Sequence, residues 1–207
     1  MTDTRALARD ERAELAAFLA TLTPEQWDAP TLCAGWTVRD VVAHVVGYDP
    51  LGVSGFVGAL ARARFDADRA NQRVIDGLRD RDPAELVDLV RRHETPQGLT
   101  ALFGSRIALT DGAIHHQDIR RALGMPREIP AERLRAVLDF AMVAPPIGAF
   151  VRTRGLRLVA TDLDWSSGRG PEVRGPGEAV LMAAAGRGHA LDELDGPGVA
   201  TLAQRLG

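Results

Sequence analysis

Cysteine is almost absent from this sequence of 207 residues, since Cys33 is the only one. A single thiol excludes both a disulfide framework and a zinc cluster built from several cysteines. Long apolar runs are also missing. No segment reaches the length that spans a bilayer, and the first residues contain no apolar core of a secretion signal. We therefore expect a cytoplasmic protein that does not bind membranes.

Lysine is absent altogether, so arginine supplies all 25 basic residues against 28 acidic ones, and the formal net charge is -3. This balance provides no basic field for nucleic acid, and we expect no nucleic-acid partner. A guanidinium is a fixed cation that can hold a carboxylate through two hydrogen bonds. Hydrophobic residues make up 45% of the chain, which is typical of a globular protein with a substantial core.

Apolar residues recur at helical spacing through most of the sequence up to residue 150. Thr37 and Asp40 form a capping-box sequence, which predicts that a helix begins at Val38. The sequence therefore predicts a helical bundle over residues 1–150. Within it, further helices are expected at 5–21, from Phe56 to Arg79 with a break near Phe65, from Asp82, at 102–123 and from Pro130.

The pattern changes near Arg154. Leu156, Leu158 and Ala160 alternate with other residues in a way that is typical of a strand, and Ser166 begins a segment with turn signals. We predict that residues 151–207 form a small C-terminal α/β domain. The expected fold class is mainly α, with a helical bundle followed by this small α/β segment.

Asp111 and His115 are the candidate site residues with the clearest spacing. Residues four apart on a helix lie on one face, so both side chains can point to the same place. His44 lies in a second helical segment and can supply a third ligand. Three protein ligands of nitrogen and oxygen type leave a coordination position open, which is typical of a catalytic zinc.

Each of these residues also has a simpler explanation. A histidine among valines, such as His44, is commonly a buried and hydrogen-bonded side chain, and pairs spaced like Asp111 and His115 arise by chance. Three candidate ligands on two helices are the more specific signal, because metal sites in bundles are built from facing helices. The sequence thus predicts a divalent metal, with zinc preferred, bound by His44, Asp111 and His115.

Residues beside the ligand pair have further possible roles. His116 projects about 100° away from His115, so we expect it at the flank of the site or at the surface. Asp118 faces the same side as His115 and can orient its second ring nitrogen, or it can pair with Arg120 or Arg121. These two arginines are candidates for binding an anionic cofactor, and a solvated helix end is the alternative.

Other polar residues are expected to have ordinary structural roles. Cys33 has no histidine or acid near it in the sequence, so we expect a small buried residue rather than a nucleophile. His93 and His189 lie near loop signals and are expected in solvent.

Two blocks of the sequence resemble a known family. The blocks are LTPEQWDAPTLCAGWTVRDVVAH at residues 22–44 and DGAIHHQDIRRALG at residues 111–124, and the tail segments 162–165 and 173–176 resemble it as well. Together they resemble the mycothiol-dependent maleylpyruvate isomerase family, which belongs to the DinB-like group of four-helix bundles. The resemblance covers nearly the whole chain.

The resemblance implies a DinB-like bundle that holds a divalent ion, usually zinc. A histidine of the second helix and a later acid-xxx-His pair bind the ion in that family, and they match His44, Asp111 and His115. The characterised isomerase has glutamate at the acid position, so Asp111 is one methylene shorter. Mycothiol is implied as the thiol cosubstrate, and Arg120 or Arg121 would hold a carboxylate of the thiol or substrate.

The leading hypothesis for function is a metal-dependent enzyme that applies mycothiol to a small electrophilic substrate. Addition of the thiol to a cis double bond permits rotation, and elimination then gives the trans isomer; a retained adduct is the product of S-transfer. A metal-dependent hydrolase that activates water is the alternative. A third interpretation is a metal-binding protein without turnover. The sequence does not indicate the oligomeric state.

Overall fold

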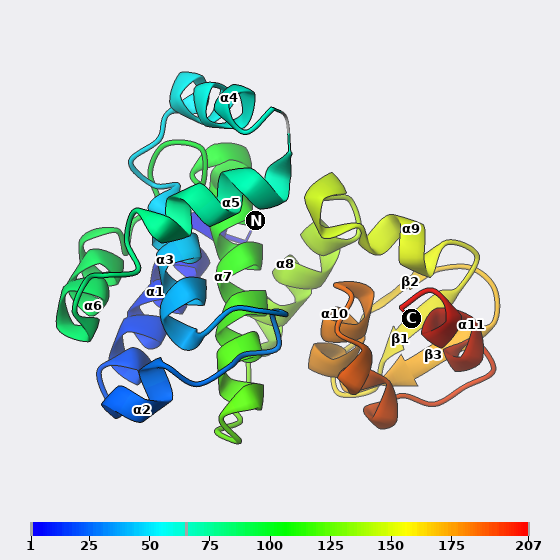
Figure 1. Ribbon diagram of the computed structural model, residues 1–207. Coiled ribbons are helices and arrows are strands. Elements are labelled where there is room, and N and C mark those ends of the chain that lie inside the picture. Colours follow the sequence, from blue (N-terminus) through cyan, green and yellow to red (C-terminus); the bar gives the residue numbers. More distant parts are fainter. Residues whose placement is uncertain (1, 65, 207) are drawn as a thin grey trace. The chain divides into compact units, whose positions relative to one another are not determined.

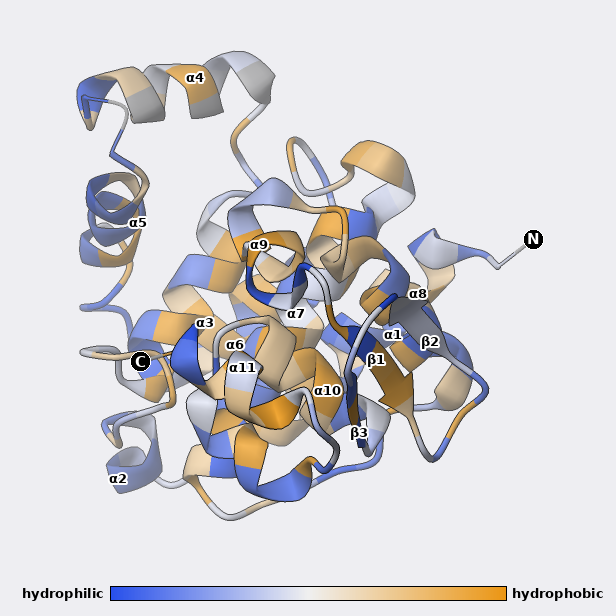
Figure 2. Cartoon of the chain, turned by 90° about the vertical axis from the view of Figure 1, so that its right-hand side faces the viewer, coloured by the Kyte–Doolittle hydropathy of each residue, from blue (hydrophilic) through white to orange (hydrophobic). Residues whose placement is uncertain are grey.

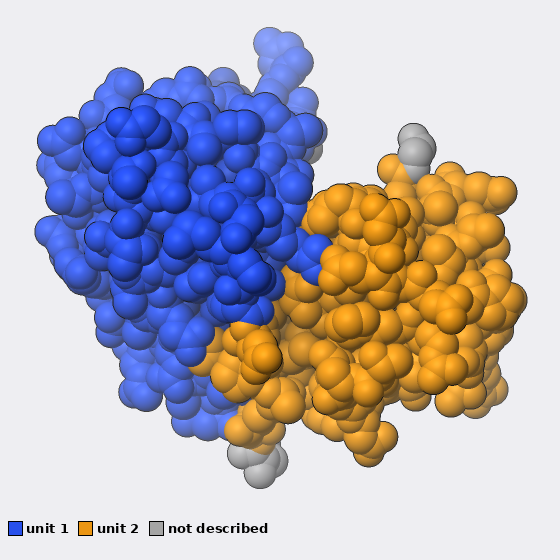
Figure 3. All heavy atoms as spheres, turned by 90° about the horizontal axis from the view of Figure 1, so that it is seen from below, with its two compact units in different colours: residues 1, 3–127 blue, residues 2, 128–207 orange. Residues whose placement is uncertain are grey.

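The computed structural model describes residues 2–64 and 66–206. Contacts divide the chain into two compact units, of which the first comprises residues 3–127 and the second begins at Glu128 (Figure 3). Within the described residues, no helix has both the length and the apolar character of a membrane span.

The first unit is helical (Figure 1). Its helices are α1 (Thr4–Leu19), α2 (Pro24–Trp27), α3 (Val38–Gly47), α4 (Val53–Arg62), α5 (Ala67–Asp76), α6 (Pro83–Arg92) and α7 (Leu102–Ala122). The expected break falls between α4 and α5, while Phe65 itself lies outside the described residues.

The start of α3 confirms the expected capping box. The backbone N–H of Thr37 donates to Asp40 Oδ2 at 3.0 Å, and the backbone N–H of Asp40 donates to Thr37 Oγ1 at 3.3 Å. Both groups would otherwise lack partners at a helix N-terminus. A local pair of side chains therefore sets where the helix that carries His44 begins.

Helices α1, α3, α6 and α7 surround the core of the first unit (Figure 1). Helix α1 packs on α6 and α7, and α3 packs on the same two helices. Burial of one large apolar side chain contributes roughly 1.5–3 kcal/mol, so this cluster holds the helices together. Its members include Leu15, Leu19, Trp27, Val38, Val41, Val42, Val45, Leu86, Val90 and Ile119.

The first turn of α7 is irregular. Phe103, Gly104 and Ser105 all have positive φ angles, at 54°, 68° and 65°, which side chains of L residues rarely adopt. Thr4 Oγ1 donates to Gly104 O at 2.7 Å and ties this stretch to the start of α1. The regular part of α7 therefore begins after Ser105, later than the sequence pattern predicts.

The second unit begins with a helix that the sequence pattern assigns to the bundle. Helix α8 packs on α10, so the contacts place the division of the chain before α8 rather than at residue 150. The elements of this unit are α8 (Ala131–Ala141), the 3-10 helix η1 (Pro145–Ile147), α9 (Ala149–Thr153), β1 (Arg157–Ala160), β2 (Ser166–Gly168), β3 (Glu172–Gly175), α10 (Gly177–Ala184), the 3-10 helix η2 (Gly188–Glu193) and α11 (Val199–Gln204).

A three-stranded sheet in the order β2-β1-β3 forms the second part of this unit, with β2 antiparallel and β3 parallel to β1. Leu158 and Ala160 of β1 are buried, as the alternation predicts, whereas Ser166–Gly168 forms a strand although the sequence predicts a turn there. Helix α10 is largely hydrophobic in Figure 2, in contrast to α5, and it packs on β1 and β3. The mainly helical fold with a small C-terminal sheet agrees with the sequence.

Candidate metal centre

Two helices of the first unit bring His44, Asp111 and His115 together. His44 lies in the last turn of α3, and the other two residues lie four apart on α7. Asp111 Oδ1 is 3.6 Å from His44 Nε2 and 3.6 Å from His115 Nε2. Each residue offers one ligand atom within 4.8 Å of the others. The three residues that the sequence singles out are thus neighbours, while their role as ligands stays a prediction.

The chemistry and spacing of these atoms fit a divalent cation such as zinc, which prefers imidazole nitrogen and carboxylate oxygen in such sites. Two ligands of a tetrahedral ion with bonds of about 2.0–2.1 Å lie roughly 3.3 Å apart. The side chains of His44 and His115 are 11% and 12% exposed, whereas that of Asp111 is 39% exposed. Small molecules can therefore reach the group from the side of Asp111.

The three side chains influence one another's charge. Burial raises the pKa of Asp111, but the imidazoles of His115 and His44 outweigh it and lower this pKa to about 2. Burial lowers the pKa of His115, but Asp111, Asp118 and Cys33 outweigh it and raise this pKa to about 10. A carboxyl group or an imidazole must lose its proton before it can bind a metal ion through that atom. Asp111 already has the required charge, and His115 must give up a proton.

Asp118 orients the ring of His115. The two residues are joined through His115 Nδ1 and Asp118 Oδ2 at 3.0 Å, and the carboxylate is fully buried. A carboxylate accepts hydrogen bonds, so Nδ1–H donates, and loss of the other ring proton leaves the lone pair of Nε2 on the side of Asp111. Of the two roles expected for Asp118, this geometry supports orientation of His115.

Cys33 lies at the same carboxylate. Its thiol donates to Asp118 Oδ2 at 3.1 Å, and Sγ is 3.5 Å from His115 Nδ1. Cys33 therefore has a histidine and an acid beside it in space, although neither lies near it in the sequence. Both partners come from α7, 85 and 82 residues away in the chain, so no local signal reveals them.

The loop between α2 and α3 places Cys33 and Trp36 beside the candidate metal group, which consists of His44, Asp111 and His115. The backbone N–H of Trp36 donates to the backbone oxygen of Cys33 at 3.0 Å. Gly35 within this turn has a φ of 79°, a conformation that favours glycine. The centroid of the Trp36 ring is 5.1 Å from that of His44 and 6.2 Å from that of His115. The loop thus covers both imidazoles with an aromatic side chain.

Tyr48 is a further neighbour that the sequence analysis does not single out. Its ring meets that of His44 edge to face, with centroids 5.6 Å apart, and its hydroxyl donates to Asn71 Oδ1 at 2.6 Å. Burial, together with the charge of Asp111, raises the pKa of Tyr48 to about 12. The phenol therefore stays protonated and links α3 to α5 beside the metal group.

His116 is buried rather than at the flank or the surface, which corrects the sequence-based expectation. Its Nδ1 lies 2.9 Å from Glu11 Oε1, and Arg120 Nε donates to its Nε2 at 2.9 Å. Burial is the main cause that lowers the pKa of His116 to about 4, so the ring is neutral at neutral pH. Glu11 lies on α1, 105 residues earlier, and no local pattern predicts this contact.

Arg120 contacts protein groups rather than the three candidate ligands. Besides His116, its guanidinium lies 3.9 Å from the centroid of the Phe18 ring and donates to Met125 O at 3.0 Å. Arg121 follows it in the last turn of α7. The role of Arg120 and Arg121 in binding an anionic cofactor stays a prediction.

Comparison with known proteins gives a family match that includes His44 and ends before Asp111. Residues 8–102 match the family model described as the mycothiol maleylpyruvate isomerase N-terminal domain. No curated protein matches the sequence significantly.

Two crystal structures share the fold. That of a histidine-to-alanine variant of the mycothiol-dependent maleylpyruvate isomerase has a TM-score of 0.61 at 20% identity, covering 93% of this chain and 90% of that one. A structure of the mycothiol-dependent maleylpyruvate isomerase has a TM-score of 0.57 at 17% identity, with the same coverage. The comparisons thus assign residues 8–102 to the N-terminal domain of the mycothiol maleylpyruvate isomerase family and show that the chain shares the fold of these structures.

Proposed function

We propose that this chain is a divalent-metal-dependent enzyme that uses a low-molecular-weight thiol, preferably mycothiol, on a small electrophilic substrate. The observation that carries the proposal is the convergence of His44 Nε2, His115 Nε2 and Asp111 Oδ1 in a chain whose residues 8–102 match this family model. The reaction is cis–trans isomerisation when the thiol leaves again, and S-transfer when it stays on the product.

His44, Asp111 and His115 would hold the ion, with zinc as the preferred metal. A bound divalent cation lowers the pKa of a coordinating thiol and so favours the thiolate near neutral pH. Asp118 keeps the proton of His115 on Nδ1, which leaves Nε2 free as a ligand. Trp36 covers the two imidazoles, and the exposed side of Asp111 leaves room for the thiol and substrate.

The position of the chain's own thiol supports the use of an external one. Cys33 bonds to Asp118 on the Nδ1 side of the His115 ring, whereas the candidate ligand atom of that ring is Nε2. A nucleophile for a substrate beside Asp111 would therefore come from solution.

Cobalt-substituted protein tests this proposal, because sulfur coordination to cobalt gives a strong near-ultraviolet charge-transfer band. Addition of mycothiol should produce the band in the wild type and in Cys33→Ser, and not in His44→Ala. A band that is lost in Cys33→Ser would assign the sulfur to the protein. If no thiol gives a band while an ester or amide is hydrolysed, the chain is a hydrolase instead.

A further inference from the structure

A cavity of about 340 Å³ lies within the first unit, and none of His44, Asp111 and His115 lines it. Its walls come from the end of α3 and the segment that follows, and from α4, α5 and α6. A volume of this size is in the range of pockets for small organic molecules, roughly 300–1,000 Å³. The proposed function makes no use of this cavity.

Most of the wall is aliphatic. Val46 comes from α3, Leu51 from the segment after it, Val74 from α5 and Leu89 from α6. Since several segments contribute, the apolar surface is concave and can enclose the apolar body of a ligand. Removal of apolar ligand surface from water would supply the favourable free energy of binding.

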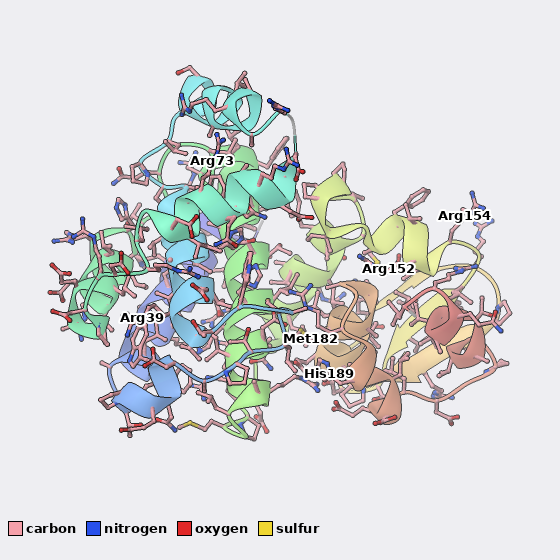
Figure 4. All side chains as sticks on the ribbon, viewed as in Figure 1. Arg39, Arg73, Arg152, Arg154, Met182 and His189 are labelled. Carbon is pink, nitrogen blue, oxygen red and sulfur yellow. The ribbon has the colours of Figure 1, made fainter. Side chains whose placement is uncertain are left out.

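Three nitrogen-bearing side chains also line the cavity, namely Arg62, Arg73 and His93. Neither Arg62 nor Arg73 has an ion-pair or hydrogen-bond partner for its side chain within residues 2–64 and 66–206. By contrast, Arg69 on the same helix α5 pairs with Asp66 at 3.3 Å. Figure 4 labels Arg73 on α5, near α4, which also borders the cavity.

His93 supplies a second observation. Its Nδ1 is buried and has no hydrogen-bond partner among the described residues, so the expectation of a solvated ring is wrong for this atom. A buried polar atom without a partner is destabilising unless another molecule satisfies it. The cavity that His93 lines is the place from which such a molecule could do so.

We propose that this cavity is a second binding site, separate from the metal group, for a small organic acid with an apolar body. The carboxylate is held by the guanidinium groups of Arg62 and Arg73, which match it through charge-assisted hydrogen bonds. The apolar body lies on Val46, Val74 and the other aliphatic residues. A neutral ligand leaves both cations unpaired, and a cationic ligand is repelled by them.

Isothermal titration calorimetry of the zinc-loaded full chain tests the proposal with three probes of equal length: octanoate, octanol and octylammonium. Octanoate should bind with a stoichiometry of one and at least about tenfold more tightly than octanol, since hydrogen bonds to charged groups are the stronger ones. Arg73→Gln and Arg62→Gln should each lower the affinity for octanoate by about tenfold or more. Arg69→Gln, on the same helix but outside the cavity, should leave its affinity unchanged.

Two more variants separate this cavity from the metal group and from nonspecific binding. His44→Ala should retain octanoate binding, and loss of binding there would place the carboxylate on the metal and overturn the proposal. Ala59→Phe should fill part of the cavity and lower the affinity for octanoate. The proposal is also overturned if octanoate does not bind, if octanol binds equally well, or if neither arginine variant lowers the affinity.

Discussion

The thiol of Cys33 and the carboxylate of Asp118 are 3.1 Å apart, and the oxygen that accepts from the thiol is the one that also accepts from His115 Nδ1. Asp118 is fully buried, so these contacts are shielded from water. The loop before α3 thereby helps to orient a side chain of α7. The candidate metal group is supported by a third segment in addition to the two helices that carry it.

Asp118→Asn should lower the affinity for zinc by about 10–100-fold, as is usual when the partner of a liganding imidazole is lost. The amide keeps the shape of Asp118 but removes the charge that holds the Nδ1 proton of His115. Competition with a chromophoric chelator measures the effect. Cys33→Ser, which keeps a donor to Asp118, is the control and should stay close to wild type. Equal zinc affinity in Asp118→Asn and wild type would contradict this role.

The zinc affinity of the wild type should rise with pH. The pKa of His115 is raised to about 10, so at lower pH a proton must leave the ring before Nε2 can bind an ion. Release of one proton per ion makes the dissociation constant fall about tenfold for each pH unit in this range. Titrations in buffers that do not bind zinc, from about pH 5.5 to about pH 7.5, measure this slope. A pH-independent affinity would exclude His115 as a ligand.

The fold should lose stability in acid because of His116. Its pKa in the folded protein is about 4, below the ordinary value of 6.5, so the unfolded chain binds the proton first as pH falls. The neutral ring therefore makes its full contribution to the free energy of unfolding above pH 6.5. This contribution is lost as pH falls from 6.5 towards 4. Urea unfolding at different pH values measures this effect. As pH falls, the free energy of unfolding should decrease less for His116→Gln than for the wild type, because glutamine does not titrate. An equal decrease in both proteins would assign the acid sensitivity to other groups.

Asp49→Ala should be strongly destabilising. Arg12 and Asp49 form an ion pair of 2.6 Å with side chains that are 1% and 0% exposed, so the variant leaves a buried guanidinium without its counter-charge. Removal of one partner from such a pair costs about 3–5 kcal/mol in the free energy of unfolding. Asp10→Ala is the control, because the Arg9–Asp10 pair is exposed and should contribute less than about 1 kcal/mol. Chemical denaturation compares the two, and a similar loss in both would contradict the argument.

Local patterns predict those parts of the structure that local physics determines. The capping pair of Thr37 and Asp40 marks the start of α3, and the helical period places Asp111 and His115 on one face. The approach of His44 to this pair depends on the packing of two helices. It was expected because metal sites in helical bundles are built from side chains on facing helices.

Contacts between distant segments were not predictable in the same way. Cys33 meets Asp118 across 85 residues, and Glu11 meets His116 across 105 residues, without any pattern in the intervening sequence. The start of α8 follows from Pro130, but its membership in the second unit depends on packing against α10. Periodicity identifies an apolar face and does not identify which core buries it.

The bond between Glu11 and His116 has a consequence for the rotational phase of α7. Consecutive residues on a helix project about 100° apart, so a helix slipped by one residue would present His116 where His115 now stands. In that position the buried Glu11 would lose its imidazole partner. The direction in which Asp111 and His115 point is therefore fixed in part by a buried hydrogen bond, independently of anything that binds between them.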